Sequence, residues 1–167
     1  MFAIQTFTLV SDFGEDRIRM DVRNKENVTQ AIMLTRRLMD RAIPKMAEEA
    51  ENLAAGPIPA NLTLPIAQQT LRQERQANPV PPVRLSDGIQ PWLCTAMQFK
   101  LQDNGVVWIL KGHGGEEARM FLSNSNLRAT LDVFATQYSA MEWARTSFPE
   151  WLIEAELEQS PARKALH

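Results

Sequence analysis

The sequence predicts an α+β fold in which helices cover an antiparallel sheet, or a small sandwich, of two three-stranded groups. Apolar and polar residues alternate in two separate regions, 2–34 and 92–122, as they do in strands that bury one face. Apolar residues recur every three or four positions over 35–53 and 126–145, as they do along one side of a helix. We therefore expect a helical insert between the strand groups and a C-terminal helix.

The first strand group is expected to be a three-stranded meander. Its clearest member is 16–22, where Ile18, Met20 and Val22 alternate with charged residues. The short polar links SDFGE and RNKEN join this strand to its neighbours in the sequence. The three expected strands are 2–10, 16–22 and 28–34.

The segment 35–53 predicts an amphipathic helix that begins after Thr35. The Thr35 hydroxyl can accept a hydrogen bond from a free amide of the first turn. Pro44 lies inside the segment and removes one helical hydrogen bond, so it either bends the helix or divides it into two. The sequence is compatible with both alternatives.

The window 55–91 differs from the rest of the chain in composition, since it holds seven of the ten prolines. We expect it to be an extended excursion between two halves of one sheet, with a short polar helix over 64–76. A chain of 167 residues is most simply one domain. We therefore expect a single domain over 1–159 and a frayed tail over 160–167.

The second strand group begins with PWLCTAMQFKLQ, in which alternate residues are apolar. Asn104-Gly105 follows, a dipeptide that favours a type I′ hairpin turn because it supplies two positive-φ positions. VVWILK is the expected return strand, and the glycine-rich turn 112–115 leads to a third strand, EARMFL.

The helix over 126–145 is predicted by five apolar residues at steps of four, three, four and three. They are Leu127, Leu131, Phe134, Tyr138 and Met141. This spacing fits either a groove on the sheet or a coiled-coil seam. Ser147 and Glu150 then have the spacing of a capping box, which predicts a short helix through Leu157.

The composition bounds the function. A net charge of −2 argues against a dedicated nucleic-acid-binding protein, which usually carries a concentrated basic excess. The single cysteine, Cys94, forms no internal disulfide, so the cytoplasm is the expected localisation. No stretch approaches the roughly 18 apolar residues needed to cross a membrane, and the first residues do not read as a secretion signal.

The sequence contains no constellation of residues that predicts an enzyme. His113 is the only internal histidine and lies far from Cys94 in the sequence, so no known spacing of metal ligands is present. The glycine-rich loop around His113 links two strands, whereas a phosphate-binding loop opens a helix. We therefore expect no catalytic residue, no metal and no cofactor.

Two groups of side chains are candidates for binding a partner. The first is the C-terminal cluster of Tyr138, Met141, Trp143, Phe148 and Trp151. Aromatic residues concentrate at protein interfaces, and packing in the core is the alternative. The second is Arg36, Arg37 and Arg41 on the helix 35–53, which form either an anion- or nucleic-acid-binding patch or a solvated face balanced by nearby acids.

The order of the expected elements resembles the globular head domains of DNA end-joining scaffold proteins and of centriolar cartwheel proteins. The resemblance covers about residues 2–145 and rests on element order. It implies a helical insert within a small antiparallel sheet or sandwich, and a C-terminal helix that dimerises. The proline-rich window is an addition to that pattern, and the C-terminal helix is too short for a long coiled-coil stalk. The strand, the LTRRL helix and the Trp-ended C-terminal helix are also similar to an uncharacterised bacterial protein family.

The leading hypothesis is a non-enzymatic interaction or assembly module that self-associates, most simply as a homodimer. A nucleic-acid accessory protein that uses the arginine face is the second. An enzyme with a pocket beneath the window 55–91 is the third.

Overall fold

The computed structural model describes residues 1–159; the predicted frayed tail 160–167 lies outside the described residues. Within that range it contains one sheet and four helices, which confirms the α+β class. The elements are, in order, β1 (Phe2–Ala3), β2 (Thr6–Asp12), β3 (Arg17–Arg23), β4 (Thr29–Thr35), α1 (Arg36–Leu53), α2 (Ala60–Ala77), β5 (Trp92–Gln102), β6 (Gly105–Gly112), β7 (Glu117–Ser123), α3 (Asn124–Ala140) and α4 (Glu150–Gln159).

The sheet has seven strands in the order β1-β7-β6-β5-β4-β3-β2 and is mixed, so the prediction of a purely antiparallel sheet is wrong. Neighbouring strands run antiparallel within β2–β4 and within β5–β7. β5 runs parallel to β4, because α1, α2 and the segment after them return the chain to the end at which β4 began. The parallel register joins Ile32 to Trp92 and Met33 to Leu93.

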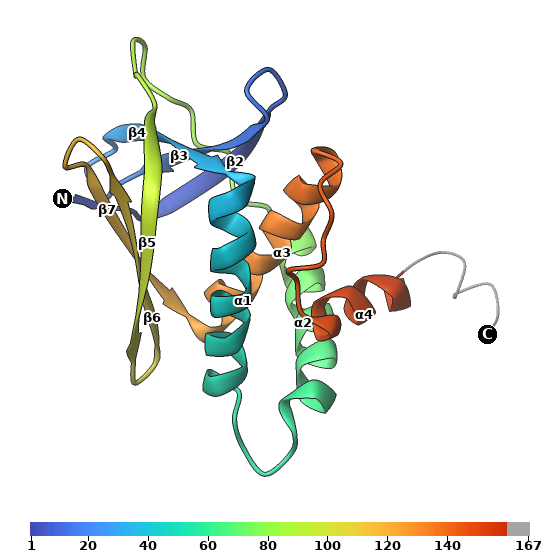
Figure 1. The fold of residues 1–167 in the computed structure, drawn as a ribbon. Coiled ribbons are helices and arrows are strands. Elements are labelled where there is room, and N and C mark those ends of the chain that lie inside the picture. The colour runs from blue at the N-terminus through green and yellow to red at the C-terminus, as the bar shows by residue number, and fades with distance from the viewer. Residues whose placement is uncertain (160–167) are drawn as a thin grey trace.

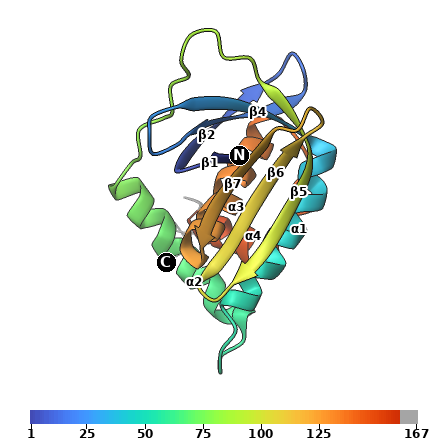
Figure 2. The same cartoon turned by 90° about the vertical axis from the view of Figure 1, so that its left-hand side faces the viewer.

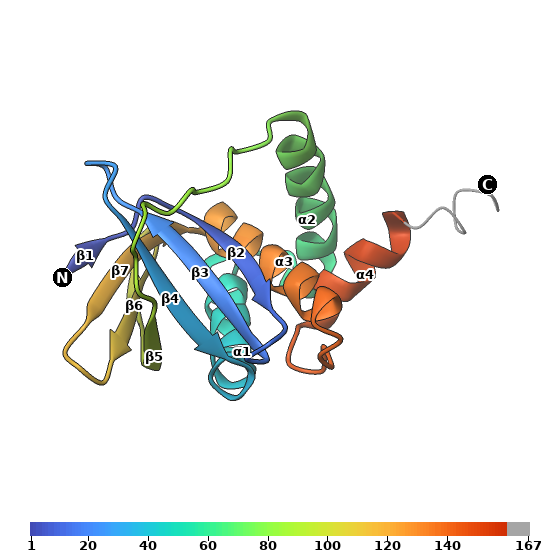
Figure 3. The same ribbon diagram turned by 90° about the horizontal axis from the view of Figure 1, so that it is seen from above.

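The expected first strand, 2–10, is divided between the two ends of this sheet. The amide of Ile4 donates to the carbonyl of Arg119 in β7 at 2.8 Å, whereas the amide of Gln5 donates to the carbonyl of Arg23 in β3 at 2.9 Å. β1 therefore pairs with β7, and β2 pairs with β3. Beyond Gln5 the edges of β2 and β7 diverge (Figures 1 and 3).

The four helices lie on one side of the bent sheet (Figure 1). α1 and α3 contact the strands directly, and α2 packs mainly on α4. The core between sheet and helices includes Trp108 from β6, Ile43 from α1 and Phe134 from α3, each fully buried. Each such side chain contributes about 1.5–3 kcal/mol to stability through its burial.

α1 is one continuous helix, so Pro44 does not divide it. The Thr35 hydroxyl caps it by accepting a hydrogen bond from the amide of Leu38 at 3.2 Å, as predicted. Pro44 is exposed, which leaves the opposite, apolar side of the helix in contact with the core.

The window 55–91 is more structured than expected, since α2 has 18 residues and includes Pro65 instead of beginning there. After α2, residues 78–91 form an extended segment, here called the strap, which runs along the outside of the sheet from α2 to β5 (Figure 2). The amide of Val83 donates to the Thr8 hydroxyl at 2.8 Å, and the amide of Ser86 donates to the Thr29 hydroxyl at 3.1 Å.

The β5–β6 hairpin is confirmed, but the predicted turn type is wrong. Its loop is Asp103-Asn104, because Gln102 pairs with Gly105. In residues 1–159 the non-glycine positions with positive φ are Asp16, Asn27 and Glu142, and neither Asn104 nor Gly105 has positive φ. Gly105 instead permits a close approach of strands, since a Cβ there would collide with the carbonyl oxygen of Leu122.

The two C-terminal helices are present, with changed boundaries. α3 ends at Ala140, and Glu142 adopts φ +57°, which turns the chain before Trp143. The predicted helix through Leu157 corresponds to α4. The Ser147 hydroxyl bonds to the Asp40 carboxylate at 3.4 Å, so it joins the chain before α4 to α1.

Candidate functional site

A groove of about 600 Å³ opens where the edges of β2 and β7 diverge. Its walls are β2, β7, α3, the C-terminal end of α2 and the beginning of the strap. The lining residues are Gln5, Thr6, Phe7, Thr8, Leu9, Leu71, Arg75, Asn78, Pro79, Val80, Pro81, Pro82, Met120, Leu122, Asn126, Ala129, Thr130 and Val133. This volume lies within the range typical of ligand-binding pockets.

The lining of the groove combines apolar and polar residues, and the groove has an exposed rim. Leu122 and Leu9 are buried beneath it, and Met120 and Val133 are partly buried, so part of the apolar surface around the groove faces solvent. Val80 of the strap is 75% exposed at the rim. Burial of such surface by a ligand is favourable at about 25 cal/mol per Å².

One wall of the groove is an unpaired strand edge. The sheet ends at β2, which has β3 as its only neighbouring strand. The amide of Asn24 donates to the carbonyl of Val28 at 3.0 Å, so the even-numbered residues of β3 bond to β4. In an antiparallel ladder the backbone groups of alternate residues point to opposite sides. Arg23 and Asp21 therefore bond to β2, at Thr6 and Thr8.

It follows that Phe7 and Leu9 direct their backbone groups away from β3, toward the groove. The Leu9 carbonyl confirms this direction, since it accepts a hydrogen bond from Nε2 of Gln137 in α3 at 3.3 Å. The alternation along β2 directs the amide and carbonyl of Phe7 and the amide of Leu9 to this edge, where no further strand pairs with β2 among the described residues. The same alternation directs the backbone groups of Phe121 in β7 to the edge that it shares with Arg119, beyond the end of β1.

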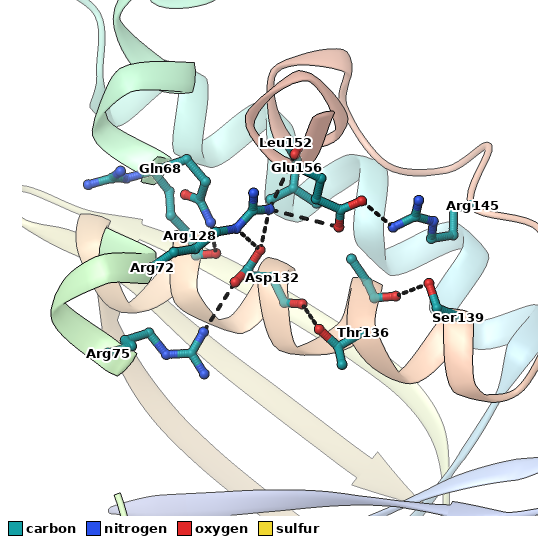
Figure 4. Close-up of polar contacts among 11 residues, drawn as sticks. Gln68, Arg72, Arg75, Arg128, Asp132, Thr136, Ser139, Arg145, Leu152 and Glu156 are labelled. Atoms are coloured by element: carbon teal, nitrogen blue, oxygen red, sulfur yellow. Dashed lines mark hydrogen bonds and ion pairs between the residues drawn. The ribbon is translucent and has the colours of Figure 1, made fainter. Parts of the chain in front are cut away.

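The groove contains one ionisable side chain, Arg75, among the residues that the structure describes. Its Nη1 lies 3.3 Å from Oδ2 of Asp132 in α3, and its side chain is 42% exposed. Asp132 also accepts two hydrogen bonds from Arg72, at 2.8 Å from Nε and 2.5 Å from Nη2 (Figure 4). One carboxylate thus positions both arginines of α2.

The buried end of this network ties α2 to α4 as well. Nη2 of Arg72 donates to the carbonyl of Leu152 at 3.3 Å and lies 3.8 Å from the carboxylate of Glu156. Glu156 in turn accepts a hydrogen bond from Arg145 at 2.6 Å (Figure 4). The network fixes the C-terminal half of α2, and with it the position of Arg75 and of the beginning of the strap.

The predicted aromatic cluster does not form an exposed surface. Its five side chains are at most 8% exposed. They are Tyr138, Met141, Trp143, Phe148 and Trp151. The Tyr138 ring packs edge-on against Trp143 and Phe148 at centroid distances of 5.1 and 5.0 Å. The prediction that these residues contact a partner is therefore corrected, because the chain itself already covers their apolar surface.

Hydrogen bonds anchor the polar ends of the cluster. The Tyr138 hydroxyl donates to Asp40 at 2.8 Å, and its burial together with this bond raises the pKa of Tyr138 above its usual value. The Trp143 indole donates to Asp16 at 2.8 Å, and that of Trp151 to Glu51 at 3.1 Å.

Arg36, Arg37 and Arg41 are exposed on α1, and none of them lines the groove. Nε of Arg36 lies 3.9 Å from Asp40, whereas Arg37 and Arg41 have no carboxylate within 4.0 Å among the described residues. The structure therefore places all three exposed side chains on α1, with that of Arg36 partly neutralised.

No hydrogen bond joins Cys94 to His113 among the described residues. The Cys94 thiol contacts the carbonyl of Ala96 at 3.3 Å, and burial raises the pKa of Cys94 to about 11, so the reactive thiolate is disfavoured. His113 is exposed in the β6–β7 turn. In the described part of the chain, no three His, Cys, Asp or Glu residues are grouped so as to hold a metal ion.

Comparison with protein-family models, with curated proteins and with solved structures found no match. Of the helices within residues 1–159, none combines the length and apolar character needed to span a bilayer.

The sequence-based interpretation missed the groove, although it located the segments that build it. The sequence predicts the strand over Phe7 and Leu9, but the position of that strand at the edge of the sheet depends on the strand order. The one local signal was the run Asn78–Pro82, in which prolines follow closely after α2.

Proposed function

We propose that the protein is a non-enzymatic interaction module that holds a segment of a partner protein in the groove between β2 and β7. The observation that supports this most strongly is the unpaired edge of β2, which borders a groove with apolar residues in its lining. Natural proteins usually cover or block such edges, because free amides and carbonyls recruit further strands. Here the edge is left accessible beside apolar surface.

Binding without catalysis is supported by the chemistry of the lining. The groove residues include no histidine, cysteine, aspartate, glutamate, lysine or tyrosine, so no side chain of the lining is a general base of the usual kinds that could activate its threonine hydroxyls. Arg75 supplies a charge for recognition.

The proposal is tested by selecting displayed hexapeptides against the full chain, and then measuring their binding to a variant with a filled groove. Ala129→Trp places an indole in the groove from α3, and we expect it to weaken binding of the selected peptides at least tenfold. Thr136→Trp is the matched control, because Thr136 is exposed on the same helix and does not line the groove. Peptides that bind all three proteins equally, or a library that yields no binder, would contradict the proposal.

We also propose that the module self-associates as a homodimer. The support is an exposed apolar surface on the N-terminal side of α2, where Ile58, Leu62 and Ile66 are 56%, 60% and 67% exposed. Sedimentation at tens of micromolar protein should give a dimer, and Leu62→Gln with Ile66→Gln should give a monomer. A wild-type monomer at that concentration removes this part of the proposal.

The alternative function is nucleic-acid binding through Arg36, Arg37 and Arg41, which is favoured by the exposure of all three on α1. Three phosphate contacts predict that the logarithm of the duplex DNA binding constant falls against the logarithm of salt concentration with a slope of about −2.7. The triple change to Glu should abolish this binding. Absence of a salt-dependent titration removes the alternative.

A further inference from the structure

We propose, on the basis of the groove binding proposed above, that the occupant is an extended peptide that adds a strand to β2 and places a carboxylate against Arg75. Three observations carry this inference: the backbone groups that face the groove, the apolar surfaces beneath it, and its single charge.

The backbone groups select an extended segment. Phe7 offers an amide and a carbonyl to the groove, and Leu9 offers an amide, while the Leu9 carbonyl is occupied by Gln137. Phe7 and Leu9 are two residues apart, which is the spacing at which a strand edge exchanges hydrogen bonds with an added strand. Every second residue of the added strand takes part in these bonds. Because Gln137 closes the ladder at Leu9, the added strand is short. β2 lines the groove from Gln5 to Leu9, which corresponds to a peptide of about five residues.

The strap does not occupy this edge itself. Three of its first residues are Pro79, Pro81 and Pro82, and proline has no N–H to contribute to a ladder. The amide of Val83 bonds to the Thr8 side chain and not to a backbone group of β2. The strap therefore forms a wall beside the edge and does not form an eighth strand.

The side chains of the groove select alternating apolar residues. In a strand, successive side chains point to opposite faces, so every second residue of an added peptide would point toward Met120, Val133 and Leu71. The intervening residues would point toward the outside of the sheet. The expected motif is therefore apolar–any–apolar, with β-branched residues favoured.

Arg75 selects an acidic residue at the end of the peptide near α2. One of its nitrogens is engaged by Asp132, and its side chain remains 42% exposed, so further N–H groups are available to a ligand. Asp132 is the one carboxylate within 4.0 Å of Arg75 among the described residues, and Arg72 shares it through two hydrogen bonds to its other oxygen. A carboxylate can therefore bind Arg75 with charge-assisted hydrogen bonds.

The inference is tested with one hexapeptide from the selection above, synthesised in four forms. N-methylation at the alternate residues that face β2 should weaken binding at least tenfold, whereas N-methylation at the intervening residues should change it less than threefold. In the third form, the acidic residue of the peptide is replaced by its amide. The fourth is the unmodified peptide.

The protein arm of the test uses Arg75→Gln, with Arg84→Gln as the control, since Arg84 is an exposed arginine of the strap that does not line the groove. Arg75→Gln should weaken binding of the acidic peptide about tenfold or more, and it should leave binding of the amide form unchanged. Equal effects of both N-methylation patterns, or an acidic peptide insensitive to Arg75→Gln, would overturn the inference. If the inference fails in this way but Ala129→Trp still abolishes peptide binding, the proposed function is retained. If no peptide depends on the groove at all, both the function and this inference fail.

Discussion

Replacing Asp132 with leucine should destabilise the protein more than any other single change in the network beneath the groove. Asp132 is the carboxylate that Arg72 contacts through two nitrogens, and the side chain of Arg72 is only 8% exposed. Removing one partner of a buried ion pair leaves an uncompensated charge, which typically costs about 3–5 kcal/mol. The bond to the Leu152 carbonyl and the carboxylate of Glu156 remain, so we expect the lower end, about 3 kcal/mol.

The matched changes separate the charge from the packing. Arg72→Leu should cost less, because Asp132 keeps its contact with Arg75 at 3.3 Å. The double change Arg72→Leu with Asp132→Leu removes both charges and should lie within about 1 kcal/mol of the wild type. The pair should therefore be coupled by about 2 kcal/mol or more.

Urea unfolding followed by circular dichroism measures these differences as shifts of the midpoint at constant m-value. Asp103→Leu, in the exposed hairpin loop, controls for the general effect of replacing an aspartate. If Asp132→Leu costs under about 1 kcal/mol, or if the double variant loses the sum of the two single losses, the buried network does not hold α2 in the way described.

Two further predictions concern the sheet and the core. Gly105→Ala should destabilise the protein by about 1–3 kcal/mol, because the added Cβ collides with the carbonyl of Leu122. The control Gly14→Ala should be close to neutral, because a Cβ there meets only an ordinary contact. Equal effects of the two changes in urea unfolding would contradict this prediction. Stability should fall as pH rises above about 9, because the folded state raises the pKa of the Cys94 thiol to about 11 and also raises that of the Tyr138 phenol, so both groups ionise first in the unfolded chain. Their contribution is present below about pH 9 and is lost as pH rises from there through the folded-state pKa values, so Cys94→Ala with Tyr138→Phe should flatten the decline of the unfolding free energy between about pH 9 and 11. An unchanged slope would contradict the assignment.

Elements with a strong internal pattern could be predicted from the sequence. Ile18, Met20 and Val22 alternate without exception, and these three side chains are fully buried on one face of β3. The apolar stripe of α1 and its cap at Thr35 are likewise local properties. Such features depend on residues a few positions apart, which is why one sequence suffices to find them.

The features that were predicted wrongly depend on residues far apart in the chain. The division of the first strand is set by the carbonyls of Arg23 and Arg119, which no local pattern in 2–10 reveals. The Asn-Gly dipeptide predicts a turn position for Gly105, but in the structure this glycine permits the close approach of the β7 backbone. The length of α2 follows from its packing against α4, which overrides the weak stripe and the internal Pro65.

The candidate site was unpredictable for the same reason. Trp143 and Trp151 are indistinguishable in sequence from exposed interface aromatics, and the turn after α3 is what directs them inward. The groove exists only because β2 lies at the end of the sheet order, so its apolar residues look like ordinary strand residues until that order is known.

Amide hydrogen exchange at Phe7 tests the central claim most directly, namely that β2 presents an unpaired edge to an extended ligand. In the full chain without peptide, the Phe7 amide should exchange much faster than the neighbouring Thr8 amide, which β3 binds. A groove-binding hexapeptide should slow exchange at Phe7 at least tenfold and leave Thr8 unchanged. Equal protection of Phe7 and Thr8 in the free protein, or bound peptide with no change at Phe7, would contradict the account.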